Sequence, residues 1–350
     1  MHGGDPDPAR AGREASPDGA LARLGASRSA LRMTVAGLVV GALFLWIAIG
    51  RVDVAAIGDV LGEVRWPWAG VTFATGVAFV SIKAWRWARM LRPLGVTGFG
   101  GLLRAVYAGT AANLTVSHVG ELVRIGMVAR RHGIAISTLL ASVALERILD
   151  FVALVGLVCI GFVLDPTLSP LLWPAGIAGL TIVAVGLAVA VAVLNADPRL
   201  VRAGRALARR LPARARAWLD AQFARAGAGL GALRDPGALL TLTLLSLAQW
   251  CAIVAAIWAG AKAVDVDMPA PSAIVVYAMT AVGLLLPSLP AQLGTTQLAF
   301  VAGFALIGEG ATLAFAASIV YTAFVMVATM IVGAGCVLVG ALPPARRRDG

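Results

Sequence analysis

Charged residues are scarce in this sequence: only 13% of its 350 residues are Asp, Glu, Lys or Arg, whereas 59% are hydrophobic. A soluble domain contains about 25% charged residues, so this composition excludes an ordinary soluble protein. The mean hydropathy is +0.87, and several apolar runs reach the ~20 residues that a helix needs to cross a bilayer. The sequence therefore predicts an all-α polytopic membrane protein.

Cysteine and histidine are also rare, with three of each. Cys159, Cys251 and Cys336 each lie inside an apolar run, where a single thiol behaves as a small hydrophobic side chain. Their spacing matches neither a metal site nor a disulfide framework. The chain also lacks a nucleotide-phosphate loop. We therefore predict no metal and no cofactor.

Acidic residues are outnumbered, because 18 Asp and Glu face 29 Lys and Arg, for a net charge of +11. The basic residues flank the apolar runs instead of forming one soluble face, which argues against a nucleic-acid partner. They gather before the first run, after the second, between Arg199 and Arg234, and at Arg346–Arg348. Cytoplasmic segments carry such an excess, so we expect a bacterial-type inner membrane protein with both termini in the cytoplasm.

The apolar runs predict about six full spans and two broken hairpins. Residues 99–131 and 272–308 are apolar but interrupted, the second by Pro287, Pro290 and Gly294. Short helical arms joined by irregular backbone are typical of re-entrant hairpins, which need protein or a water-filled cavity around them. The full spans are expected near 31–50, 66–86, 134–164, 171–194, 237–260 and 312–340.

The order of these elements indicates two inverted repeats. Residues 31–164 and 165–340 each follow the order span, span, hairpin, span, and the two halves start from opposite sides of the membrane. Gly120 and Gly294 fall together when the hairpin tips are aligned. Inverted repeats are a recurrent plan of secondary transporters, which bind substrate near the midplane. The expected organisation is a disordered cytoplasmic tail over 1–30, repeat 1 over 31–164 with hairpin 99–131, repeat 2 over 165–340 with a cytoplasmic basic segment over 199–235 and hairpin 272–308, and a basic cytoplasmic tail over 341–350.

Polar residues surround the tip of the first hairpin. Glu121 and Arg124 follow Gly120 and share one helix face. A helix N-terminus offers free N–H groups to a phosphate or carboxylate, and Arg124 would add charge-assisted hydrogen bonds. Asn113 either satisfies unwound backbone or contacts the ligand. Alternatively, Glu121 only caps the helix and Arg124 is an ordinary cytoplasmic flank.

A second group of charges lies inside the predicted span over 134–164. Glu146, Arg147 and Asp150 are three or four residues apart and share one face. A charge at the bilayer centre costs roughly 2.5–3.5 kcal/mol, so intramembrane charges are usually functional. The alternatives are a structural ion-pair network, or an interfacial anchor if the span starts near Leu149.

The second hairpin offers neutral groups. Pro287 and Pro290 break it, Gly294 aligns with Gly120, and Gln297 is a candidate hydrogen-bonding residue, as is Gln292. We expect Lys83 and Arg86 to form the cytoplasmic flank of the second span, and the neighbouring tryptophans to form an interface belt.

The chain resembles the transmembrane region of the lysylphosphatidylglycerol synthase and flippase-like family over about residues 30–340. The resemblance rests on Trp85–Gly95, Tyr107, Gly109, Asn113, Gly120, Glu121, Arg124, Glu146, Arg147, Asp150 and Leu289–Gly294. It implies translocation of aminoacylated phosphatidylglycerol or another lipid phosphate. The chain departs from the family pattern at Val116 (usually proline), Ser117-His118 (usually a small-basic pair), Gln297 (usually acidic) and Tyr321 (commonly Arg). The second half of the site is therefore more neutral.

These observations predict a non-enzymatic lipid translocase that works by alternating access. Arg124 and Arg147 would hold the lipid phosphate, and the three carboxylates would balance the arginines. The expected partners are membrane phospholipids or isoprenoid-phosphate lipids, with a second copy or a lipid-biosynthetic enzyme as a further partner. The alternatives are a membrane-embedded transferase with Glu146 or His118 as base, and a non-transporting partner subunit. No aminoacyltransferase domain follows the last span, so we do not expect this chain alone to synthesise lysylphosphatidylglycerol.

Overall fold

The computed structural model describes residues 42–115, 119–165, 235–283 and 292–341, together with positions 39, 181 and 184. Within these ranges the secondary structure is helical and contains no strand, which confirms the all-α prediction. The elements are α3 (Val54–Gly62), α4 (Trp66–Leu91), η1 (Arg92–Leu94), α5 (Phe99–Thr115), α6 (Val119–His132), α7 (Ile136–Leu164), α11 (Pro236–Ala263), α12 (Ser272–Gly283), α13 (Thr295–Leu306) and α14 (Ala311–Ala341).

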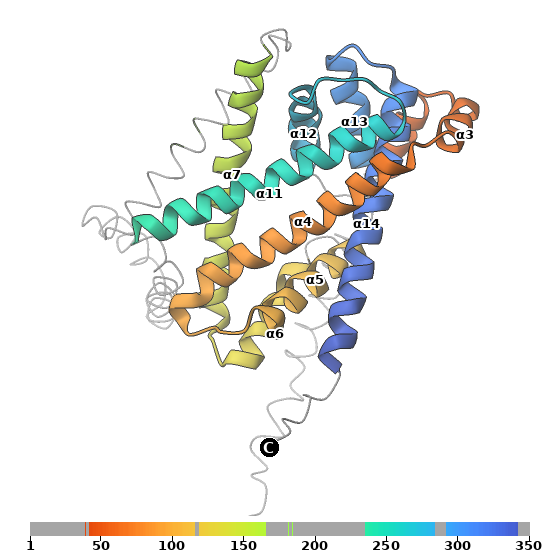
Figure 1. The fold of residues 1–350 in the computed structure, drawn as a ribbon. Coiled ribbons are helices and arrows are strands. Elements are labelled where there is room, and N and C mark those ends of the chain that lie inside the picture. Colours follow the sequence, from red (N-terminus) through yellow and green to blue (C-terminus); the bar gives the residue numbers. More distant parts are fainter. Residues whose placement is uncertain are drawn as a thin grey trace, which may run out of the picture.

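Two long antiparallel helices, α4 and α11, form the centre of the molecule (Figure 1). The Arg65 N–H, just before α4, donates to the carbonyl of Ala263 at the end of α11, at 2.9 Å. Farther along the pair, the Phe79 and Trp250 rings lie 5.7 Å apart, and Arg86 reaches Ser246. The start of each helix therefore lies beside the end of the other.

Helices α5 and α6 form the first hairpin, and two glycines set how closely they pack. A Cβ on Gly109 would lie 2.6 Å from the Gly120 carbonyl oxygen, and one on Gly120 would lie 1.9 Å from the Gly109 carbonyl oxygen. Both distances are far shorter than any real contact, so these two positions require glycine. This close approach holds the start of α6 against the middle of α5.

Helices α12 and α13 form the second hairpin, and its break lies where the sequence predicts one. Gln292 and Gly294 have φ angles of 58° and 84°, in the left-handed region that a helix does not use. A Cβ on Gly303 of α13 would lie 2.8 Å from the Cα of Val276, so these helices also pack closely. Pro287 and Pro290 lie outside the described residues.

The hairpins lie on opposite sides of the central pair, and α7 and α14 connect the parts (Figure 1). Helix α14 contacts α4, α5, α11 and α13, whereas α7 contacts α4, α6, α11 and α12. Gly161 of α7 faces Ile274 of α12, and Gly333 of α14 faces Tyr107 of α5. Helix α7, which carries charges predicted from the sequence, is therefore in contact with both central helices and with one helix of each hairpin.

Most predicted spans that fall within the described residues form helices. Gly237–Ala263 and Ala311–Cys336 are each long and apolar enough to cross a membrane. Helices α4 and α7 occupy the predicted spans over 66–86 and 134–164, and residues 42–49 of the first predicted span are helical. The predicted span over 171–194 and the basic segment over 199–235 lie outside the described residues, apart from isolated positions.

Helix α3 was not predicted from the sequence. The Asp53 carboxylate caps it by accepting from the N–H groups of Ala55 and Ala56, at 3.0 and 3.3 Å. The Asp53 N–H donates to Thr312 Oγ1 at 3.2 Å, which ties this short helix to the start of α14. The N-cap aspartate was the available sequence signal.

Candidate functional site

Seven charged side chains from three helices meet next to the central helix pair. We call them the buried charge cluster. They are Lys83 and Arg86 of α4, Glu121 and Arg124 of α6, and Glu146, Arg147 and Asp150 of α7.

Glu146 lies at the centre of this cluster and is fully buried. Arg124 Nη1 donates to Glu146 Oε2 at 2.8 Å. On the other side of the carboxylate, Arg86 Nη2 lies 3.3 Å and Lys83 Nζ 3.6 Å from Oε1. A buried carboxylate is tolerated only when it is paired, and here cations from α4 and α6 pair with one carboxylate of α7.

Asp150 extends the cluster to α11. Its Oδ1 accepts from Arg86 Nη1 at 2.6 Å and from Trp250 Nε1 at 3.1 Å. The same Arg86 nitrogen donates to Ser246 Oγ at 2.6 Å. Arg86 is fully buried, so these contacts tie α4, α7 and α11 together inside the protein.

Arg147 and Glu121 form the outer part of the cluster. The Arg147 guanidinium donates to Glu121, and Arg147 is half exposed. Asn113 Nδ2 lies 3.4 Å from the other Glu121 oxygen, and Asn113 Oδ1 accepts from the Gly120 N–H at 2.6 Å. Asn113 therefore satisfies backbone at the start of α6 and also contacts the acidic residue beside it.

Arg124 has hydrogen-bonding capacity that the described residues do not use. Its Nε and Nη2 are buried and have no acceptor in the described part of the chain. Its guanidinium lies 4.8 Å from the centre of the Trp87 ring, which holds it in place. Leaving a buried donor unpaired costs about 1–3 kcal/mol, so an acceptor that reached these nitrogens would bind favourably.

Arg124 also lines a narrow crevice, which is too tight to hold a water molecule in this structure and would have to open before an anion could enter. The other polar side chains along it are Lys83, Thr110, Asn113 and Glu121, and Gly109 and Gly120 form part of its wall. Four basic side chains face three carboxylates in the cluster as a whole, so one positive charge is in excess. Excess positive charge and unused guanidinium donors both favour a phosphate or a carboxylate.

The candidate site residues predicted in the first repeat lie together in the structure. The described residues show no contact between them and the candidates predicted in the second repeat. Asn113, Gly120, Glu121, Arg124, Glu146, Arg147 and Asp150 are linked by the contacts above. In the second hairpin, the buried Gln297 uses its Oε1 to accept from the Gly294 N–H at 2.7 Å. That hydrogen bond stabilises the start of α13. Pro290 and His118 lie outside the described residues.

Sequence reasoning missed Lys83 and Arg86. They were assigned to a cytoplasmic flank, and Trp85–Trp87 to an interface belt. The interface-belt assignment is wrong for Arg86 and Trp87, which are fully buried, although Trp85 is exposed, and the cytoplasmic flank stays a prediction. Helix α4 continues to Leu91, so Arg86 lies within it and not beyond its end. The first helix breaker after the predicted span is Pro93, and that was the available signal.

The secondary structure of the described residues is helical and includes two helices that are long and apolar enough to cross a membrane, as expected of a membrane domain. The chain matches the family model of the lysylphosphatidylglycerol synthase TM region over residues 34–333. It therefore belongs to this family, as its sequence resemblance predicts, and the family indicates a function related to membrane lipids. No curated protein matches the chain.

Proposed function

We propose that this protein moves a phospholipid or another lipid phosphate between the two leaflets of the membrane, with the phosphate bound in the crevice beside Arg124. The observation that carries the proposal is the pair of unused, buried donors on Arg124, Nε and Nη2, in a crevice that also presents Lys83. A phosphate offers the several strong acceptor oxygens that a guanidinium and an ammonium bind well.

The cluster residues have different roles in this proposal. Arg124 and Lys83 hold the phosphate. Glu146 neutralises part of their charge, which keeps binding reversible. Arg86 is a positioning residue, because its Nη1 donates to Asp150 and Ser246, its Nη2 lies 3.3 Å from Glu146 Oε1, and it does not line the crevice. Arg147 is a second phosphate ligand, which becomes free when its ion pair with Glu121 opens.

Two inverted repeats with re-entrant hairpins provide the transport mechanism in this proposal. In the proposed repeats, α4, α5 and α7 correspond to α11, α12 and α14. Corresponding helices make corresponding contacts: α4 contacts α5 and α14, and α11 contacts α12 and α7. Phe79 of α4 and Trp250 of α11 contact each other, and they lie at nearly the same distance from the start of their helices. Transporters of this plan expose a central site by rocking one unit against another. The full proposal has about six spans and two cytoplasmic termini, in a bacterial-type inner membrane.

The transferase alternative has less support than translocation. Glu146 is one of its two candidate bases, but it is fully buried and does not line the crevice where a lipid phosphate would bind. A general base must lie within hydrogen-bonding reach of the proton it abstracts. Translocation needs only a binding site and access from both sides.

The proposal is tested by measuring the transbilayer movement of a fluorescent phosphatidylglycerol in proteoliposomes. Arg124→Gln removes the charged donors, and a lost charged hydrogen bond of about 1.5–3 kcal/mol should slow movement by roughly tenfold or more. Arg89→Gln is the matched control, because Arg89 lies on the surface of α4 against Trp85, away from the cluster. Equal rates for wild type and Arg124→Gln would overturn the proposal. Movement that is slowed equally in both variants would overturn the assigned site.

A further inference from the structure

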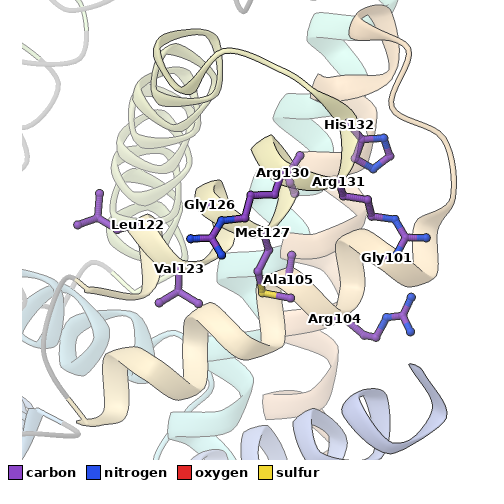
Figure 2. Close-up of a pocket in the computed structure, with 11 residues that line it drawn as sticks. Gly101, Arg104, Ala105, Leu122, Val123, Gly126, Met127, Arg130, Arg131 and His132 are labelled. Atoms are coloured by element: carbon purple, nitrogen blue, oxygen red, sulfur yellow. The ribbon is translucent and has the colours of Figure 1, made fainter. Parts of the chain in front are cut away.

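A second cavity, of about 590 Å³, lies between α5 and α6, and we call it the hairpin groove (Figure 2). This volume is within the range of pockets that hold small ligands, about 300–1,000 Å³. The groove and the crevice share no lining residue, although both are lined by residues of α5 and α6. The buried charge cluster therefore does not account for it.

One end of the groove is strongly basic. Arg104 of α5 lines it together with Arg130, Arg131 and His132 of α6, and no acidic residue is among its lining residues. In the described part of the chain none of the three arginines forms an ion pair. The cations at the end of α6 could be present only because they interact favourably with the helix dipole. The dipole does not explain Arg104, which lies in the first half of α5.

Arg104 and Arg131 converge across the hairpin. Figure 2 shows both side chains extending to the same side, with His132 beyond them. The Arg131 guanidinium passes 3.5 Å from the position where a Cβ on Gly101 would lie. The glycine thus leaves room for the arginine to lie flat against α5. Two guanidinium groups that meet without a carboxylate form a site for an anion with several oxygens.

The other end of the groove carries exposed apolar side chains, with the Arg130 side chain extending toward them (Figure 2). Leu122 and Met127 of α6 line it, with 62% and 41% of their surface exposed. Gly126 lies between them, and a Cβ added there would meet nothing within 4 Å. A groove that combines arginines with exposed apolar side chains matches an anionic amphiphile, whose headgroup and acyl chains need these two environments.

We propose that the hairpin groove is a second binding site, which takes the phosphate headgroup of an anionic lipid between Arg104 and Arg131 with the acyl chains along Leu122 and Met127. This site would supply lipid to the crevice, and that role rests on the proposed function. Arg131 is seven residues from Arg124 on the same helix, or about 10 Å along its axis. Leu122 adjoins Glu121, which lines the crevice, so the groove leads toward the cluster.

Photo-crosslinking in proteoliposomes tests the site directly. The probe is phosphatidylglycerol with a diazirine in its acyl chain, present at a low fraction in phosphatidylcholine vesicles, and adducts are located by peptide mass spectrometry. We expect adducts within residues 122–127. They should fall by at least tenfold in the double variant Arg104→Gln, Arg131→Gln, because each lost charged hydrogen bond alone weakens binding by about that factor or more. Gly126→Leu should cause a similar loss by filling the groove while all charges remain.

Matched controls separate the groove from general effects. Arg92→Gln removes an exposed arginine, and Gly100→Leu enlarges a glycine with open space around it; neither residue lines the groove, so both variants should label like wild type. Equal labelling by a phosphatidylcholine probe, or labelling that survives both groove variants, would overturn the proposal. Full competition by soluble glycerol phosphate would also overturn it, because the groove would then take a soluble phosphate ester. Labelling requires no transport, so groove-dependent labelling without lipid movement would contradict only the proposed function.

Discussion

At the scale of single residues, the ion pair between Arg147 and Glu121 differs from the other pairs of the cluster. Glu146 is fully buried and Asp150 is buried, whereas Arg147 is half exposed. Exposed pairs contribute only about 0–1 kcal/mol, so this one can open at little cost. Variants of this ion pair can therefore distinguish two hypotheses: the charges of the cluster bind a ligand, or they only hold the helices together.

Exchanging the two charges distinguishes these accounts. Arg147→Glu and Glu121→Arg should each lower the apparent melting temperature, because each places like charges together, and the double exchange should restore it. We expect lipid movement to stay low in the double variant, since the arginine would then lie on α6, away from its place on α7. Thermal unfolding in detergent and the proteoliposome assay measure the two effects. Recovery of both would favour the partner-subunit alternative.

At the scale of helices, the contact between Gly109 and Gly120 controls the shape of the first hairpin. Gly120→Ala would place a Cβ 1.9 Å from a backbone oxygen, and backbone cannot move aside as a side chain can. Overpacking costs about 1–3 kcal/mol, so we expect a lower melting temperature. The change should also widen the crevice, because the Gly120 N–H would lose its hydrogen bond to Asn113.

Gly126→Ala is the matched control for this change. Gly126 lies on the same helix, α6, and a Cβ there meets nothing within 4 Å. Alanine stabilises a helix by about 1 kcal/mol relative to glycine, so this variant should melt at an equal or higher temperature. A Gly120→Ala protein that is as stable as Gly126→Ala would contradict the close packing of α5 and α6.

The sequence predicted helices better than contacts between them. Apolar runs and helix breakers are local signals, so α7, α11 and α14 lie within a few residues of their predicted ranges. Spacing within one helix likewise grouped Glu146, Arg147 and Asp150. Lys83, Arg86, Ser246 and Trp250 were missed as site residues because they join the cluster only when α4 and α11 pack beside α7. Nothing local in the sequence encodes that arrangement.

Gln297, in contrast, was predicted to be a site residue, and the structure shows a different contact for it. Its position in the aligned hairpins suggested a neutral ligand-binding group, and that role stays a prediction. In the structure its side chain caps its own helix by accepting from the Gly294 N–H. A polar residue next to a helix start often caps that helix, and sequence spacing alone does not separate capping from binding.

At the scale of the whole molecule, the cluster divides the described helices into two groups. Hydrogen bonds from Arg86 and Trp250 to Asp150 join α4, α7 and α11 in the interior. In the described part of the chain, the ion pairs that join α6 to this group are those of Arg124 with Glu146 and of Arg147 with Glu121. A phosphate bound to these two arginines would open the Arg147–Glu121 pair, and its charge would weaken the attraction between Arg124 and Glu146. Binding should therefore loosen the hairpin and leave the central helices together.

Spin-label distances measure this division. Labels at the exposed residues Phe99 of α5 and Leu140 of α7 report on the hairpin, and labels at Trp85 of α4 and Leu244 of α11 report on the central pair. We expect phosphatidylglycerol to shift or broaden the first distance and to leave the second unchanged, relative to phosphatidylcholine. A change in the second distance alone would mean that the Arg86–Ser246 contact opens instead. The moving unit would then be one of the long helices, because breaking this contact separates α4 from α11 while the ion pairs of α6 remain.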